Sequence, residues 1–160
     1  MIKKIASLLN SQFKKELESA YIYLYFASYF DSQGLSGFSH WFKKQALEEE
    51  EHAMRIYSYL HEQKEPIQFT SIDAPKLDSD SIIQVLNETL EQEEYISRLI
   101  NNIYYETTQA NDYSTKNFLE WFIGEQREEE KQIQDIITKY TLFCIEGTSL
   151  FQLNKELAER

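Results

Sequence analysis

Apolar residues recur every three or four positions over four long stretches of the chain, a spacing typical of amphipathic helices. The pattern predicts helices at about residues 5–31, 38–64, 80–106 and 113–139, and a short fifth helix within residues 148–158. The first apolar stripe consists of Ile5, Leu9, Phe13, Ala20, Tyr23 or Leu24, Ala27 and Phe30. The next three consist of Phe42, Ala46, Ala53, Ile56 and Leu60, then Leu86, Leu90, Ile96, Ile100 and Ile103, then Phe118, Phe122, Ile133, Ile136 and Tyr140. We therefore expect an all-α protein.

Residues that break or cap helices separate these stretches. Only four Gly and two Pro occur among the 160 residues, too few for the turns of a sheet-rich fold. Polar residues 107–115 divide the third helix from the fourth, and they contain the capping candidates Asn111 and Asp112. The candidates for capping the start of the third helix are Asp78, Ser79 and Asp80. Gly124 lies inside the fourth helix, where glycine is tolerated at a cost.

The lengths of the connections predict how the helices are joined. The first and second helices, and likewise the third and fourth, are separated by short links, so each pair is expected to form an antiparallel hairpin. Both prolines fall in the longer segment 64–79. Fifteen extended residues span about 50 Å, and a helix of 27 residues is about 40 Å long. The long connection can therefore cross the whole bundle, which predicts a single-domain four-helix bundle, residues 1–160, with one long crossover.

Polar residues interrupt every apolar stripe near the middle of its helix. Glu16 interrupts the first stripe, Glu49 and His52 the second, and Glu93 the third. Gln126 and Glu129 interrupt the fourth. Because these positions lie at about the same height, whichever way each helix runs, they can meet in the core.

The charge and the single cysteine limit the classes of partner. With 27 acidic and 16 basic residues, the net charge of −11 argues against nucleic acid or an anionic membrane and favours cations. Cys144 offers no disulfide framework, and the first residues lack an apolar run long enough for a signal peptide. Nothing later approaches the length of a transmembrane helix. These features predict a cytoplasmic protein.

A metal site is the simplest explanation of the polar interruptions. A single Glu on a charge-rich helix is usually solvated, and this is our interpretation of Glu50 and Glu51. Several carboxylates buried together, however, repel one another and lose hydration unless protons or cations compensate. Carboxylates with one imidazole suit iron, manganese or zinc. Glu49 can bridge two ions, and it forms with His52 the Glu-x-x-His pair found in di-iron helix bundles.

The chain resembles the bacterial non-haem ferritins over essentially its whole length. The resemblance is carried by ALEEEEH around Glu49 and His52, by NFLEWFIGEQREEEK in the fourth predicted helix, and by Tyr23 seven residues after Glu16. It implies a ferritin-like bundle that oxidises Fe(II) with dioxygen or hydrogen peroxide at a di-iron centre. It also implies a homo-oligomeric shell of two dozen subunits, a 24-mer, which stores ferric oxyhydroxide mineral.

The same resemblance implies roles for particular residues. The di-iron centre would consist of a first site with Glu16, Glu49 and His52, a second with Glu49, Glu93 and Glu129, and Gln126 beside them. Tyr23 would lie next to this centre and hydrogen-bond a ligand. A third iron site on the cavity side would use Glu48, Glu125 and Glu128.

Departures from related families narrow these expectations. Glu50 stands where a bacterioferritin carries its haem-binding Met, and the fourth helix lacks a second Glu-x-x-His, so no haem is expected. One Cys cannot build the iron module of a rubrerythrin. Lys116 and Leu119 replace the acidic residues that line the three-fold channel of animal ferritins. Two other classes stay open: a di-iron or manganese-iron oxidase or peroxidase without mineral storage, and a non-catalytic bundle with solvated glutamates.

Overall fold

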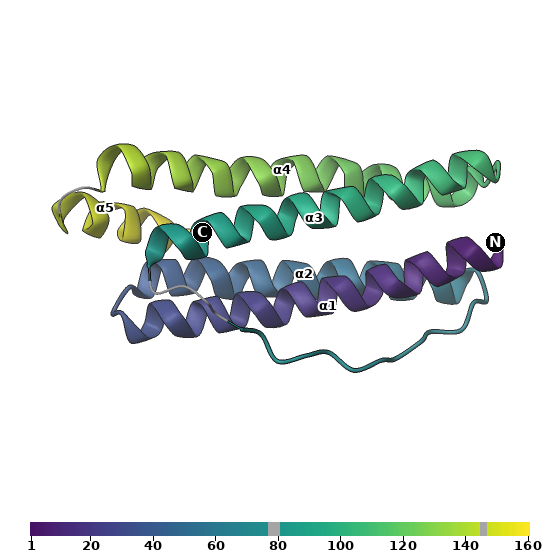
Figure 1. Cartoon of the computed structure of the whole chain (residues 1–160), viewed down its shortest axis with the longest axis horizontal. Coiled ribbons are helices and arrows are strands. Elements are labelled where there is room, and N and C mark those ends of the chain that lie inside the picture. Colours follow the sequence, from purple (N-terminus) through teal and green to yellow (C-terminus); the bar gives the residue numbers. More distant parts are fainter. Residues whose placement is uncertain (77–80, 145–146) are drawn as a thin grey trace.

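The computed structural model describes residues 1–76, 81–144 and 147–160. Its elements are α1 (Lys3–Ser32), α2 (Ser36–Glu62), α3 (Ile82–Gln109), α4 (Tyr113–Phe143) and α5 (Gly147–Leu157). Four long helices lie side by side, and α5 lies at one end of the bundle (Figure 1). The described part of the chain contains no strand. The predicted all-α bundle with a short fifth helix is confirmed, with helix ends displaced by at most four residues.

The turns between paired helices use left-handed backbone conformations. Gly34 has a φ of 73° after α1, and Asn111 has a φ of 54° after α3. Asp112 then caps α4, its carboxylate accepting a hydrogen bond from the Thr115 N–H at 3.1 Å. Of the two candidates, Asp112 is thus the cap, whereas Asn111 forms the turn, a conformation that asparagine tolerates better than most residues.

The crossover from α2 to α3 runs along the outside of the bundle, so these two helices point the same way (Figure 1). Buried Asn10 on α1 holds this segment: its amide donates to the Pro66 carbonyl at 3.1 Å and its oxygen accepts from the Gln68 N–H at 2.7 Å. Ser81 caps α3. The cap candidates Asp78, Ser79 and Asp80 lie outside the described residues. The predicted single crossover is confirmed.

The apolar core consists of two clusters, one toward each end of the bundle. One cluster contains Tyr23, Phe30, Phe38, Phe42, Leu86 and Ile133. The other contains Leu9, Phe13, Ile56, Leu60, Ile100 and Phe122. Tyr23 is buried, whereas Leu24 is 46% exposed, which settles the alternative left open for the first stripe. Between the two clusters lies a layer of buried polar side chains.

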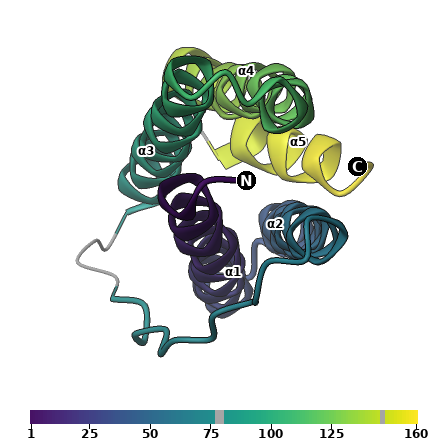
Figure 2. The same ribbon diagram turned by 90° about the vertical axis from the view of Figure 1, so that its right-hand side faces the viewer.

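The fifth helix docks between α2 and α4 (Figure 2). Leu153 and Leu157 bury their side chains there. Asn154 accepts hydrogen bonds from the N–H groups of Gly37 and Phe38 at 2.9 and 3.1 Å. Because no neighbouring side chain caps the start of α2, Asn154 satisfies these donors from a distant part of the chain. Among the helices described, none has the length and apolar run that crossing a membrane would require.

Candidate metal centre

All four long helices contribute to the polar layer at mid-height of the bundle. Six of the contributing residues were expected there because they interrupt an apolar stripe. The buried members, each at most 3% exposed, are Glu16, Glu49, His52, Glu93, Gln126 and Glu129. The expected convergence is therefore observed, whereas Glu50 and Glu51 are exposed as expected.

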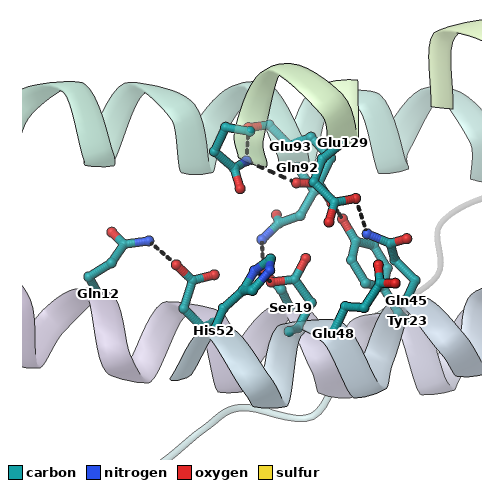
Figure 3. Close-up of polar contacts among 12 residues, drawn as sticks. Gln12, Ser19, Tyr23, Gln45, Glu48, His52, Gln92, Glu93 and Glu129 are labelled. Carbon is teal, nitrogen blue, oxygen red and sulfur yellow. Dashed lines mark hydrogen bonds and ion pairs between the residues drawn. The ribbon is translucent and has the colours of Figure 1, made fainter. Parts of the chain in front are cut away.

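Glu16, Glu49 and His52 form a tight group on α1 and α2. Their candidate ligand atoms all lie within 4.8 Å of one another, and His52 Nδ1 is 3.3 Å from Glu49 Oε2. Gln12 donates to one oxygen of Glu16 at 2.8 Å (Figure 3). The other Glu16 oxygen, both Glu49 oxygens and His52 Nδ1 are buried without a hydrogen-bond partner. Such orphaned acceptors are costly, and a cation would satisfy them together.

Glu93 and Glu129 stand on α3 and α4, facing this group (Figure 3). Glu93 accepts hydrogen bonds from the Tyr23 hydroxyl and, at 3.1 Å, from the Gln126 amide. Gln45 donates to one oxygen of Glu129, and the other oxygen has no partner. A carboxylate oxygen has two lone pairs, so these bonds leave acceptor capacity on both residues. Gln126 thus contacts the centre through Glu93.

The three residues expected at a third site do not form one group in this structure. Glu48 is paired with Arg160, Glu125 is half-buried and Glu128 is exposed. Glu125 lies within 4.8 Å of both His52 and Glu129, measured between candidate ligand atoms. The two groups within that distance in the described chain are this one and the Glu16 group; neither includes Glu48, Glu93 or Glu128.

The electrostatics of the layer favour bound cations. Burial, followed by the charges of Glu93, Glu16 and Glu129, raises the pKa of Glu49 well above its usual range. Burial likewise raises the pKa of Glu93 to about 7 and that of Glu129 to about 8. Burial and the Glu93 charge raise the pKa of Tyr23, so its hydroxyl is a neutral donor. In the described chain, no Lys or Arg forms an ion pair with a buried carboxylate of this layer.

Proton release on metal binding follows from these shifts. At pH 7 the metal-free layer retains a proton on Glu129 and partly on Glu93, and an incoming cation displaces them. We expect Zn²⁺ binding at pH 7 to release at least about one proton per chain, and the affinity for Zn²⁺ to rise with pH up to about 8. Calorimetry in two buffers of different ionisation enthalpy measures this release. Heats that are independent of the buffer would contradict the expected protonation.

The stability of the metal-free protein should fall over the pH range in which the affinity for Zn²⁺ rises. The folded-state pKa values of Glu93 and Glu129 lie above 4.5, the value for a free Glu, so the folded state binds more protons than the unfolded chain between about pH 4.5 and 8. Its free energy of unfolding therefore falls as pH rises through that window. Added cations should reverse the loss because they bind the deprotonated folded form.

Two glutamines support the centre and were not anticipated. Gln12 donates to Glu16, and Gln45, which is 1% exposed, donates to Glu129. Each stands four residues before an expected ligand, Glu16 or Glu49, and so shares its helix face. This spacing was a signal that could have identified both.

Aromatic rings fix the position of the imidazole. The Trp121 ring meets His52 edge to face, with ring centroids 5.4 Å apart. The guanidinium of Arg55 lies over the Trp121 ring, 4.0 Å from its centroid, and forms a cation–π contact with it. Phe122 contacts His52 from the core, with centroids 6.1 Å apart. His52 therefore presents its nitrogen to the carboxylates from a packed position.

Comparisons with known proteins agree with this arrangement. The ferritin-like domain family matches residues 6–143. The chain is 34% identical over 158 residues to a bacterial non-heme ferritin of Staphylococcus aureus (strain NCTC 8325 / PS 47), covering 99% of this chain and 95% of that protein. It is 33% identical over 155 residues to a probable bacterial non-heme ferritin-like protein of Haemophilus influenzae, covering 97% and 94%. An open pore ferritin from Archaeoglobus fulgidus superposes with a TM-score of 0.98 at 36% identity, covering 100% of this chain and 99% of that one.

Proposed function

This chain belongs to the ferritin-like domain family, and we propose that it is an iron-storage protein with ferroxidase activity. The observation that carries the proposal is the buried layer in which five carboxylate and imidazole atoms lack any hydrogen-bond partner and face one another from α1, α2 and α4. Its substrates are Fe(II) and dioxygen or hydrogen peroxide. Carboxylate oxygens and one imidazole are suitable ligands for iron.

Two Fe(II) ions are proposed to bind side by side in the layer. Glu16 and His52 hold the first ion, Glu93 and Glu129 hold the second, and Glu49 bridges the two. Gln12 and Gln45 orient the outer ligands, and Gln126 with Tyr23 orients Glu93. Each Fe(II) gives one electron to the oxidant. The second site has no imidazole and is expected to hold iron less firmly, which suits a centre that releases its product.

The assembly and the fate of the product are part of the proposal. Relatives named ferritin at 33% to 36% identity over nearly the whole chain support a homo-oligomeric shell, here a 24-mer. Ferric ions leave the centre by way of Glu48, Glu125 and Glu128 and are stored as ferric oxyhydroxide. We propose that residues 1–160 form one domain, that the protein works in the cytoplasm and that it carries no haem.

Iron loading in excess of the centre tests storage. We expect metal-free protein that receives Fe(II) without oxygen, and then air, to continue oxidising iron after the first two ions per chain. Absorbance of the ferric product gives the amount oxidised, and electron microscopy of the same sample shows whether mineral lies inside the shell. Oxidation that stops at about two irons per chain would overturn storage and favour the oxidase without mineral.

A further inference from the structure

Arg160 lies over α2 and contacts the edge of the metal centre. Its guanidinium is ion-paired with Glu48, donates to Gln45 Oε1 at 2.8 Å and lies 4.8 Å from the centroid of the Trp41 ring. Its main-chain oxygen is 2.9 Å from His40 Nε2. Because these contacts come from one side chain and its backbone, the guanidinium is held at a defined place and is not a freely solvated charge.

The contact with Gln45 extends to the buried layer. A guanidinium has only donors, so the Gln45 oxygen must face Arg160. The Gln45 nitrogen is thereby directed at Glu129, to which it donates. Arg160 is thus one hydrogen-bonded residue away from a proposed iron ligand and in direct contact with Glu48, a residue proposed for the third iron site.

A groove beside Arg160 offers its side chain space away from Glu48. The groove, of about 350 Å³, lies between α2, α4 and α5, and Arg160 forms part of its wall. Two carboxylates that already pair with lysines, those of Asp135 and Glu156, also line the groove and could accept from the guanidinium as well if it left Glu48. The Arg160 side chain is 20% exposed at its present place, on the wall of this groove.

We propose that Arg160 is a gate on the third iron site, a built-in cation that occupies Glu48 until a metal ion displaces it. This inference rests on the proposed function. One carboxylate cannot pair fully with a guanidinium and a divalent ion at once, so the two compete for Glu48. Occupancy by Arg160 keeps the third site weak, and its displacement frees Gln45 at the moment when product iron must leave Glu129.

Zinc binding to the full chain tests the gate. Zn²⁺ suits these ligands and does not change oxidation state. We expect calorimetry on the wild-type shell to show two tightly bound ions and a weaker third ion per chain. Arg160→Ala should raise the affinity for the third ion about five- to tenfold. Arg160→Lys should restore part of the suppression, because an ammonium can pair with Glu48 without holding Gln45 as well.

Two control variants separate a gate from a general effect of removing a cation. Arg98→Ala removes another arginine that lies over an aromatic ring, that of Tyr95, and Lys43→Ala removes an exposed cation on α2 that pairs with Asp31. Both should leave the third-ion affinity unchanged. The gate would be overturned if Arg160→Ala left that affinity unchanged or lowered it, if either control raised it equally, or if no third ion bound to either the wild type or Arg160→Ala. Absence of the tight pair from the wild-type shell would overturn the proposed function as well.

Discussion

Replacing Glu49 with alanine is expected to slow Fe(II) oxidation by about a hundredfold or more while the bundle stays folded. Glu49 lies in one group with Glu16 and His52, and the charges of Glu93 and Glu129 on the facing helices also act on it. It is therefore the proposed bridging ligand, and its loss affects both ions at once. Stopped-flow absorbance of the ferric product under air measures the rate, and circular dichroism reports the helices.

The same position should show a trade-off between stability and activity. Both Glu49 oxygens are buried without a hydrogen-bond partner, and burial raises the pKa of this carboxyl. Glu49→Gln keeps the volume and removes the ionisable group, so the metal-free variant should unfold at a temperature no lower than that of the wild type, with no further rise when Zn²⁺ is added. Glu51→Ala, an exposed neighbour on the same helix, is the matched control for oxidation and stability. An oxidation rate unchanged in Glu49→Ala would remove the proposed centre.

Gly37→Ala is expected to undock α5 and to cost about 3–5 kcal/mol in the free energy of unfolding. A Cβ at Gly37 would lie 1.6 Å from the Asn154 carbonyl oxygen, which is backbone and cannot swing aside. Relief of this clash separates α5 from α2 and removes both hydrogen bonds to Asn154. The buried surfaces of Leu153 and Leu157 would then face water.

Chemical denaturation gives the loss of stability, and amide hydrogen exchange shows whether α5 loses protection before the four long helices do. Gly124→Ala is the matched control, because a Cβ there meets no atom within 4 Å and alanine favours the helix by up to about 1 kcal/mol. That variant should be as stable as the wild type or more stable. Equal stability of Gly37→Ala and the wild type would contradict the close approach of α5 to α2.

The spacing of apolar residues predicted the helices and the polar layer, because both can be recognised from residues close together in the sequence. Glu16 and Glu93, for example, interrupt their stripes at the position that faces the core, and the structure buries both. The crossover followed from chain length and from the place of the two prolines. The ends of helices were less well predicted, as when α4 continues to Phe143, since fraying and packing rather than residue type decide the last turn.

Contacts between distant segments could not be obtained from the pattern. Asn10 binds the crossover and Asn154 caps the start of α2. Neither role is indicated by the sequence, because both are ordinary polar residues whose partners become neighbours only in the folded chain. The pairing of Arg160 with Glu48 is of the same kind, and it alters the expected third site. Such partners depend on how helices dock, which a single-helix pattern does not encode.

Anomalous diffraction from crystals soaked briefly in Fe(II) is the most direct test of the central claim. We expect two iron peaks per chain inside the bundle. One should contact Glu16, Glu49 and His52, and the other Glu49, Glu93 and Glu129. Iron found only on the outer surface, or a buried layer without any iron peak, would contradict that claim.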